Sequence, residues 1–325
     1  MSAQTRRLLF RALQVAFVVA VFVYGGQRIA ADWGAARAQA GEGGLLELRW
    51  GPLLGATLLV YLTYLLLVQL WRFVLRAWRT QLPLADALAI WFISALGRYV
   101  PGRVAAIAAM AVMSRRRGVS AAAATGSAVL NTLLNIAAGL LVVVVLGGAH
   151  LDRILPGAGR AAPLLAALAV AGTVLLPWLL PRITRLAARL ARRQIDVPPT
   201  PASAIWLTLA GNVIAWGLYG LAFMWFASGV LGGATGATTS YVAVYTLSYV
   251  AGYLFLPAPG GLGVREGVMV AGLTAFGLAS EPEAWLLAFA SRLWLLLLEI
   301  LPGLLFLAHS AVRPRPPVTS GDASP

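Results

Sequence analysis

Two arginines flank a helix-breaking stretch of the chain, where their side chains could bind an anion. Arg98 and Arg103 lie in the stretch GRYVPGR, in which Gly97 and Gly102 permit unusual backbone angles and Pro101 ends a helix. A guanidinium grips a phosphate with paired hydrogen bonds, and a helix beginning near Gly102 would point free N–H groups at the same anion. The alternative is that both arginines snorkel to a lipid–water interface at a structural turn.

A second broken stretch, PGGLGVREG, places Arg265 beside Glu266. It predicts a helix that ends near Pro257, a glycine-rich turn, and a new helix that begins near Val264. Glu266 then lies in a first helical turn, where the helix dipole favours a carboxylate. Arg265 would meet an anionic headgroup and Glu266 an arginine; the alternative is a structural pair that neutralises itself. The residues predicted to break this helix are Pro259, Gly260, Gly261 and Gly263.

Further polar side chains lie in the middle of apolar runs. Arg292 and Glu299 are seven residues apart, so they share one helix face, about 10 Å apart along its axis. Asn131 and Asn135 are four residues apart and also share a face. Such groups either line a cavity or hydrogen-bond to neighbouring helices. We favour the cavity for the charged pair and leave both readings open for the asparagines.

Two other patterns indicate structure more than binding. Tyrosines recur at every fourth position along one predicted helix, which favours helix packing; they are Tyr241, Tyr245, Tyr249 and Tyr253. Asp86 opens an apolar piece and is suited to be a helix N-cap.

The elements that carry these residues are predicted membrane helices. The 325-residue chain is 60% hydrophobic and only 11% charged, whereas a soluble domain carries roughly a quarter charged residues. Its apolar runs are continuous, which argues against a β-barrel, and approach the roughly 20 residues needed to span a bilayer. The first run could pass for a signal peptide, but we keep it as a membrane helix. The six predicted crossings are residues 8–30, 52–75, 118–147, 163–181, 201–227 and 284–308.

Two apolar stretches are each divided into pieces that are poor spans. Residues 86–113 hold two pieces of about a dozen residues, and residues 240–280 hold two pieces of about 16–18 residues. Each stretch therefore predicts a re-entrant hairpin that enters and leaves the membrane on one side.

Arginine placement sets the predicted topology. Arginine is concentrated in segments that the positive-inside rule places in the cytoplasm, together with both chain termini. These segments are residues 1–11, 72–85, 114–118, 182–200 and 309–325. The first hairpin then enters from the cytoplasm and the second from outside.

The predicted fold is an all-α polytopic membrane protein with two inverted repeats. Each half reads helix, helix, hairpin, helix and crosses three times, so the second half lies upside down relative to the first. Residues 1–311 form a single integral-membrane domain, with repeat one at about 1–150 and repeat two at about 160–311. Residues 312–325 read as a disordered cytoplasmic tail.

Composition excludes several classes of function. The chain has no cysteine and two histidines, so we expect no metal site, and we expect no cofactor. Most of its arginines lie at the ends of apolar runs and not on one soluble face, so we expect contacts with anionic membrane lipids and not with nucleic acid. No catalytic motif is visible, so we do not expect an enzyme.

The two broken stretches resemble the signatures of a known family. GRYVPGR at 97–103, followed by GVS at 118–120, and PGGLGVREG at 259–267 are similar to motifs of the flippase-like membrane domain of lysylphosphatidylglycerol synthases, the multiple-peptide-resistance proteins. The resemblance covers nearly the whole chain and implies a protein of the bacterial cytoplasmic membrane that moves a lipid between leaflets. The chain lacks the soluble aminoacyl-transferase domain of the full-length synthases, so we do not expect it to synthesise lysylphosphatidylglycerol.

These features together predict a lipid flippase that moves an anionic or lipid-linked headgroup across the cytoplasmic (inner) membrane. Arg98 and Arg103 would hold the phosphate from the cytoplasmic side, and Arg265 and Glu266 would form the counterpart from outside, with Arg292 and Glu299 beside them. The alternative is a membrane-embedded enzyme or accessory subunit for lipid aminoacylation or lipid-linked glycan synthesis. The expected partner is a phospholipid or other lipid; a homodimer or a complex with a separate synthase is compatible with the sequence.

Overall fold

The computed structural model describes most of the chain from residue 48 onwards. The described residues are 48–97, 104–147, 200–255, 261 and 263–312, with Gln27 and scattered positions between 151 and 182. Within this part of the chain every regular element is a helix. The predicted crossing at 8–30, apart from Gln27, and the tail beyond residue 312 fall outside it, whereas 11 of the 19 residues at 163–181 are described, and these are helical.

Four long helices are apolar enough to cross a membrane. They have 28, 27, 30 and 32 residues, so each is longer than the roughly 30 Å thickness of a bilayer core. Each confirms one of the predicted runs. Their bounds are Trp50–Ala77 for α2, Ala121–Gly147 for α5, Ala202–Leu231 for α8 and Glu281–Val312 for α11.

The long helices carry apolar side chains on their outer faces as well as inside. On α2, Leu54, Leu58 and Leu62 recur every fourth residue and are exposed. On α11, Leu293, Leu297 and Leu301 do the same, although Leu295 and Leu298 on the inner face are buried. Exposed apolar stripes at helical spacing can contact lipid acyl chains, so these faces suit a lipid environment.

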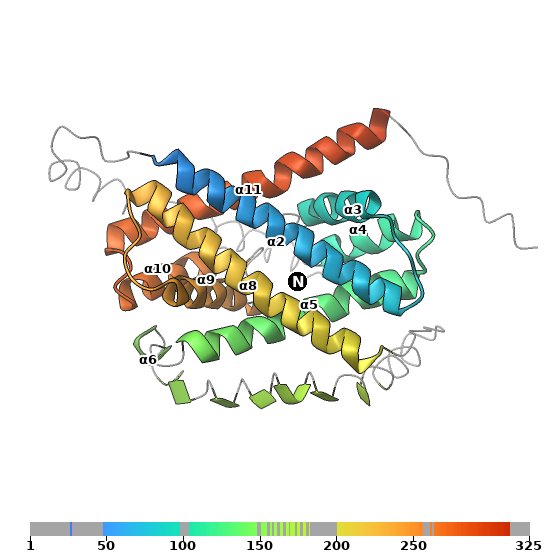
Figure 1. Cartoon of the computed structure of the whole chain (residues 1–325), viewed down its shortest axis with the longest axis horizontal. Helices are drawn as coiled ribbons and strands as arrows, with labels where there is room; N and C mark the ends of the chain where they lie inside the picture. The colour runs from blue at the N-terminus through green and yellow to red at the C-terminus, as the bar shows by residue number, and fades with distance from the viewer. Residues whose placement is uncertain are drawn as a thin grey trace, which may run out of the picture. The chain divides into compact units, whose positions relative to one another are not determined.

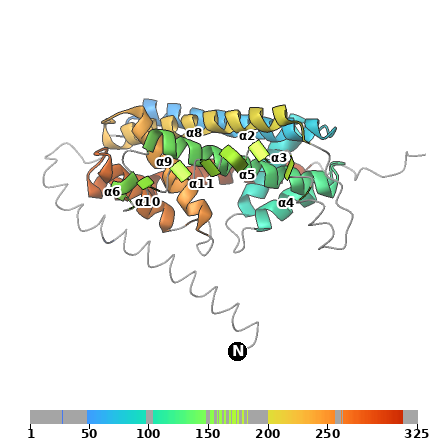
Figure 2. The same cartoon turned by 90° about the horizontal axis from the view of Figure 1, so that it is seen from below.

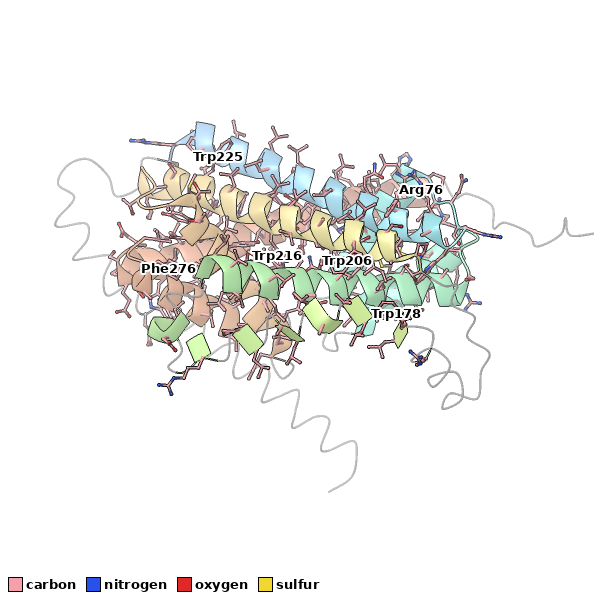
Figure 3. All side chains as sticks on the ribbon, turned by 60° about the horizontal axis from the view of Figure 1, so that its bottom comes forward. Arg76, Trp178, Trp206, Trp216, Trp225 and Phe276 are labelled. Atoms are coloured by element: carbon pink, nitrogen blue, oxygen red, sulfur yellow. The ribbon has the colours of Figure 1, made fainter. Side chains whose placement is uncertain are left out.

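Glycines let α2 and α8 pack closely. A Cβ atom added to Gly55 on α2 would lie 2.6 Å from the Trp225 ring on α8, and one added to Gly211 would lie 2.5 Å from a Leu70 methyl group. Figure 1 shows α2 and α8 running along each other, and Figure 3 labels Trp225 on this part of α8. Small residues at such contacts are typical of membrane helix pairs, because they let the backbones approach.

The α5 and α8 helices run in the same direction. The Asn135 Nδ2 atom on α5 donates to Asn212 Oδ1 on α8 at 2.8 Å. One turn further along both helices, a Cβ on Gly139 would lie 3.2 Å from Trp216 Nε1, and Figure 3 labels Trp216 at this place. Both contacts join residues 77 positions apart, which fixes a parallel register between the helices.

The chain divides into two compact units, and each contains part of every long helix. Unit 1 is Met1–Thr63, Ala138–Leu168 and Val213–Leu296; unit 2 is Tyr64–Ala137, Ala169–Asn212 and Leu297–Pro325. Each unit also contains one pair of shorter helices joined by a broken stretch. The inverted repeats themselves stay a prediction.

In unit 2 the helix pair consists of α3 (Leu84–Leu96) and α4 (Val104–Arg115), which lie side by side (Figure 2). The described end of α3 and start of α4 lie on either side of the stretch that the sequence predicts to break the helix. The N-cap prediction for Asp86 is wrong, because Pro83 holds that position and Asp86 lies in the first turn. Its carboxylate forms an ion pair with Arg117, just beyond α4, so the outer ends of the pair are tied together.

In unit 1 the helix pair consists of α9 (Thr238–Leu254) and α10 (Val264–Ala275), which also pack on each other (Figure 2). The predicted helix start at Val264 is confirmed. At 12 residues, α10 is shorter than the predicted 16–18, because Gly277 at φ 65° ends it and the Leu278 N–H bonds back to the Leu273 carbonyl. The outer ends meet here as well, where the Thr235 hydroxyl donates to the Leu278 carbonyl at 3.1 Å. A short helix, α6 (Leu151–Ile154), lies against α10.

Candidate functional site

At the tip of the α9–α10 pair, two glycines adopt backbone angles that other residues reach only with strain. Gly261 has φ 70° and Gly263, the N-cap of α10, has φ 84°, both in the left-handed region. A Cβ on Gly261 would lie 2.6 Å from the carbonyl oxygen of Gly252 on α9. Gly261 therefore lies directly against the α9 backbone, close to the start of α10.

Glu266 is held at the start of α10 by its own backbone and by α11. Its Oε2 atom accepts a hydrogen bond from the Gly263 N–H at 2.6 Å, as a carboxylate at the third helical position can. Its Oε1 atom lies 3.6 Å from Arg292 Nε, an ion-pair distance beyond hydrogen bonding. The carboxylate is buried, with 2% of the side chain exposed, against 17% for Arg292.

Arg265 is turned towards α9 and buried there. Its Cζ atom lies 4.4 Å from the ring centroid of Tyr249 and 5.5 Å from that of Tyr245. Its Nη2 atom also donates to the Tyr245 hydroxyl at 3.4 Å. The two neighbouring charges at the tip therefore have different partners, because successive residues of a helix point about 100° apart. The mutually neutralised pair is not what the structure shows.

We call Arg265, Glu266 and Arg292 the α10 charge cluster; Arg265 and Glu266 are buried, and Arg292 is partly exposed. The cluster combines two guanidiniums with one carboxylate, so its own formal charge is +1. Burying net charge is costly unless an opposite charge or hydrogen bonds offset it. Guanidiniums match the planar geometry of a phosphate or carboxylate, so the cluster is chemically suited to a single anionic group.

Glu299 lies on the same helix as Arg292. It accepts a hydrogen bond from the Tyr64 hydroxyl at 3.1 Å, and both residues belong to unit 2. Tyr64 packs edge-on against Phe92 of α3. Arg292 and Glu299 are predicted to share one helix face, but they contact different partners. Arg292 pairs with Glu266 in unit 1, and Glu299 bonds to Tyr64 in unit 2.

The two asparagines of α5 differ in their contacts. Asn135 is bonded to Asn212, whose own Nδ2 atom donates to the Thr208 carbonyl at 2.8 Å, so it joins two helices. Asn131 is buried, and its Oδ1 atom has no hydrogen-bond partner among the described residues. The hydrogen bond of Asn135 therefore joins two helices, and both readings stay open for Asn131.

Most of the first broken stretch lies outside the described residues. The residues outside include Arg98, Pro101, Gly102 and Arg103. At the second break, Pro259 and Gly260 also lie outside the described residues. Gly97 is described, and it ends α3 with φ −66° and ψ −17°, which are ordinary helical angles. The unusual backbone angle predicted for Gly97 is therefore absent, because the chain is still helical there.

Sequence reasoning missed three residues that contact the predicted charges: Tyr245, Tyr249 and Tyr64. The four-residue spacing of the tyrosines was visible, but it favoured packing alone. The contact between the tyrosines and Arg265 depends on α10 packing against α9, which brings Arg265 onto the same stripe. Gly252 was also missed, since nothing in the sequence shows that another backbone lies against it.

Comparison with known proteins identifies the membrane domain. A family model described as the lysylphosphatidylglycerol synthase TM region matches residues 8–306, which confirms the resemblance noted in the sequence. No curated protein matches the chain. With four long apolar helices in the described residues, this match establishes a multi-pass membrane protein of a family tied to lipid modification or translocation.

Proposed function

The chain belongs to the lysylphosphatidylglycerol synthase transmembrane-region family, and we propose that it moves a phosphate-bearing lipid headgroup between the leaflets of the cytoplasmic membrane. The headgroup would pass through the protein while the acyl tails stay in the bilayer. No ATP-binding motif occurs in the sequence, so movement would run downhill or with an ion. On this proposal the chain is a transporter and not an enzyme.

The observation that carries the proposal is the α10 charge cluster. Arg265 and Glu266 are 6% and 2% exposed, in a chain whose outer faces are apolar. Charged residues at membrane depth are expensive, and they commonly mark a substrate path. A phosphodiester carries one negative charge, which offsets the cluster's formal charge of +1. Arg98 and Arg103 would receive the same phosphate from the cytoplasmic side.

The re-entrant arrangement of the helix pairs is part of the proposal. The α3, α4 and α10 helices have 13, 12 and 12 residues, which is about 18–20 Å, well short of a bilayer core of roughly 30 Å. In each pair the outer ends meet, at Asp86 with Arg117 and at Thr235 with Leu278. Each pair would thus enter the membrane and return to the same side.

The parallel direction of α5 and α8 supports a further membrane crossing in the segment that connects them. Two parallel spans need a connection that returns through the membrane, and residues 163–181 form the apolar run available for it. With residues 8–30 as the first crossing, the chain makes six crossings, and both termini lie in the cytoplasm. The two helix pairs would then enter from opposite sides as an inverted repeat.

The proposal is tested with purified protein in vesicles that contain fluorescent phosphatidylglycerol, by measuring how fast the probe becomes accessible to an external quencher. Arg265→Ala is expected to slow movement about tenfold or more, because it removes charge-assisted hydrogen bonds to phosphate. Arg265→Lys, which keeps the charge but loses the planar fork, should fall between Arg265→Ala and the wild type. The matched control is Arg116→Ala, an exposed arginine whose loss changes the net charge equally.

Two results would reject this function. One is movement by Arg265→Ala at the wild-type rate in protein that remains folded by size-exclusion chromatography. The other comes from lipid mass spectrometry of a deletion strain. A missing lipid species would favour the enzyme or accessory subunit, whereas an unchanged lipid retained in the inner leaflet supports the flippase.

A further inference from the structure

Arg265 rests on a set of aromatic rings that neighbouring side chains hold in place. The Tyr249 ring centroid is 4.4 Å from its Cζ atom and the Tyr245 centroid 5.5 Å. The Tyr245 ring stacks on the Tyr219 ring of α8 with centroids 5.8 Å apart. The rings of Tyr249 and Trp216 pack edge to face with centroids 5.2 Å apart. Because α8 fixes both rings, α9 presents a rigid surface to the guanidinium.

A ring face holds a guanidinium without using its hydrogen-bonding edge. The attraction comes from the quadrupole of the ring and strengthens where water is excluded. The five N–H donors of a guanidinium lie in its plane, so stacking directs them outwards. A carboxylate in the same place would accept those hydrogen bonds and compete with a phosphate.

The one carboxylate of the α10 charge cluster is engaged elsewhere. Glu266 accepts from the Gly263 N–H at 2.6 Å and faces Arg292 at 3.6 Å. In this cluster, therefore, Arg292 is held by the carboxylate and Arg265 by the rings. The two arginines are stabilised by different means.

We propose that Tyr249, assisted by Tyr245, is a positioning residue that holds Arg265 in the orientation in which it binds a lipid phosphate. The ring of Tyr249 is the effective group, and the hydroxyl of Tyr245 adds one hydrogen bond at 3.4 Å. This inference rests on the proposed function, since it assigns a role within the same site. It gives the stripe of tyrosines on α9 a use beyond packing.

The experiment measures binding separately from movement. Native mass spectrometry of the detergent-purified full chain, titrated with phosphatidylglycerol, gives an apparent affinity. Tyr249→Leu, which removes the ring, is expected to weaken binding about tenfold. Tyr249→Phe keeps the ring and should bind within about twofold of the wild type, while Tyr245→Phe should lose no more than a few-fold.

A matched control separates positioning from general loss of packing. Tyr241 belongs to the same stripe and packs against Phe223, and it is 1% exposed. Tyr241→Leu should lower the unfolding temperature as much as Tyr249→Leu does, yet leave the affinity for phosphatidylglycerol unchanged.

The outcomes distinguish this inference from the proposed function. Wild-type affinity in Tyr249→Leu, or equal loss in Tyr249→Phe and Tyr249→Leu, overturns the positioning role. Equal loss of affinity in Tyr241→Leu also overturns it, because packing alone would then explain the effect. If the wild type binds with the expected ring dependence but moves no lipid in vesicles, the positioning role stands and the flippase proposal fails.

Discussion

At the scale of single residues, the two asparagines of α5 test the difference between joining helices and lining a path. Asn135 is bonded to Asn212 at 2.8 Å, whereas Asn131 Oδ1 is buried without a hydrogen-bond partner in the described part of the chain. Asn135→Leu should lower the free energy of unfolding by about 1 kcal/mol, because Asn212 loses its partner. Asn131→Leu should leave stability unchanged or raise it by up to about 1 kcal/mol, because it removes an unpaired buried oxygen.

The two variants serve as controls for each other, since they make the same substitution one turn apart on one helix. Thermal unfolding in detergent measures their stability, and the vesicle assay measures lipid movement. Slowed movement in a fully stable Asn131→Leu would support cavity lining. A loss of stability as large as that of Asn135→Leu would show that Asn131 also joins helices, against our expectation.

At the scale of elements, the close contact between Gly261 and Gly252 sets the geometry of the α9–α10 tip. Gly261→Ala should destabilise the protein by about 1–2 kcal/mol or more, because alanine disfavours φ 70° and its Cβ would lie 2.6 Å from the Gly252 carbonyl oxygen. The loss should also slow lipid movement, since this turn positions Arg265. Denaturant or thermal unfolding, alongside the vesicle assay, measures both.

The control is Gly267→Ala in the first turns of the same helix. A Cβ there has no atom within 4 Å, and alanine favours a helix over glycine by up to about 1 kcal/mol, so stability should hold or rise. Equal effects of the two substitutions would mean that the tip contact does not control the position of α10.

Sequence reasoning predicted the elements better than their contacts. The four described spans and both breaks follow from apolar length and from glycine and proline, which act locally. The end of α10 also had a local signal, since Gly277 follows Phe276 as glycines follow helices, but the prediction ran past it. The partners of Arg265 and Glu266 had no such signal, because they come from α9 and α11 and depend on how the chain folds back.

At the scale of the whole molecule, the number of crossings between the two helix pairs decides whether the halves are inverted. The α5 and α8 helices supply two crossings, and an odd total requires residues 163–181 to supply the third. The first pair begins and ends near Gln81 and Ser120, and the second near Ala237 and Ser280; all four residues are exposed. An odd total places the two pairs on opposite sides of the membrane.

The chain has no cysteine, so single cysteines can be introduced at these four positions without other changes. A membrane-impermeant maleimide added to intact spheroplasts should label Ala237→Cys and Ser280→Cys, and label Gln81→Cys and Ser120→Cys only after permeabilisation. Labelling of all four from one side would mean an even number of crossings and would remove the inverted repeat. A fifth variant, Val264→Cys at the start of α10, tests re-entry itself. Because α10 is about 18 Å long, it cannot bring that residue to the opposite surface, so the reagent should not reach it from the cytoplasmic side in inside-out vesicles.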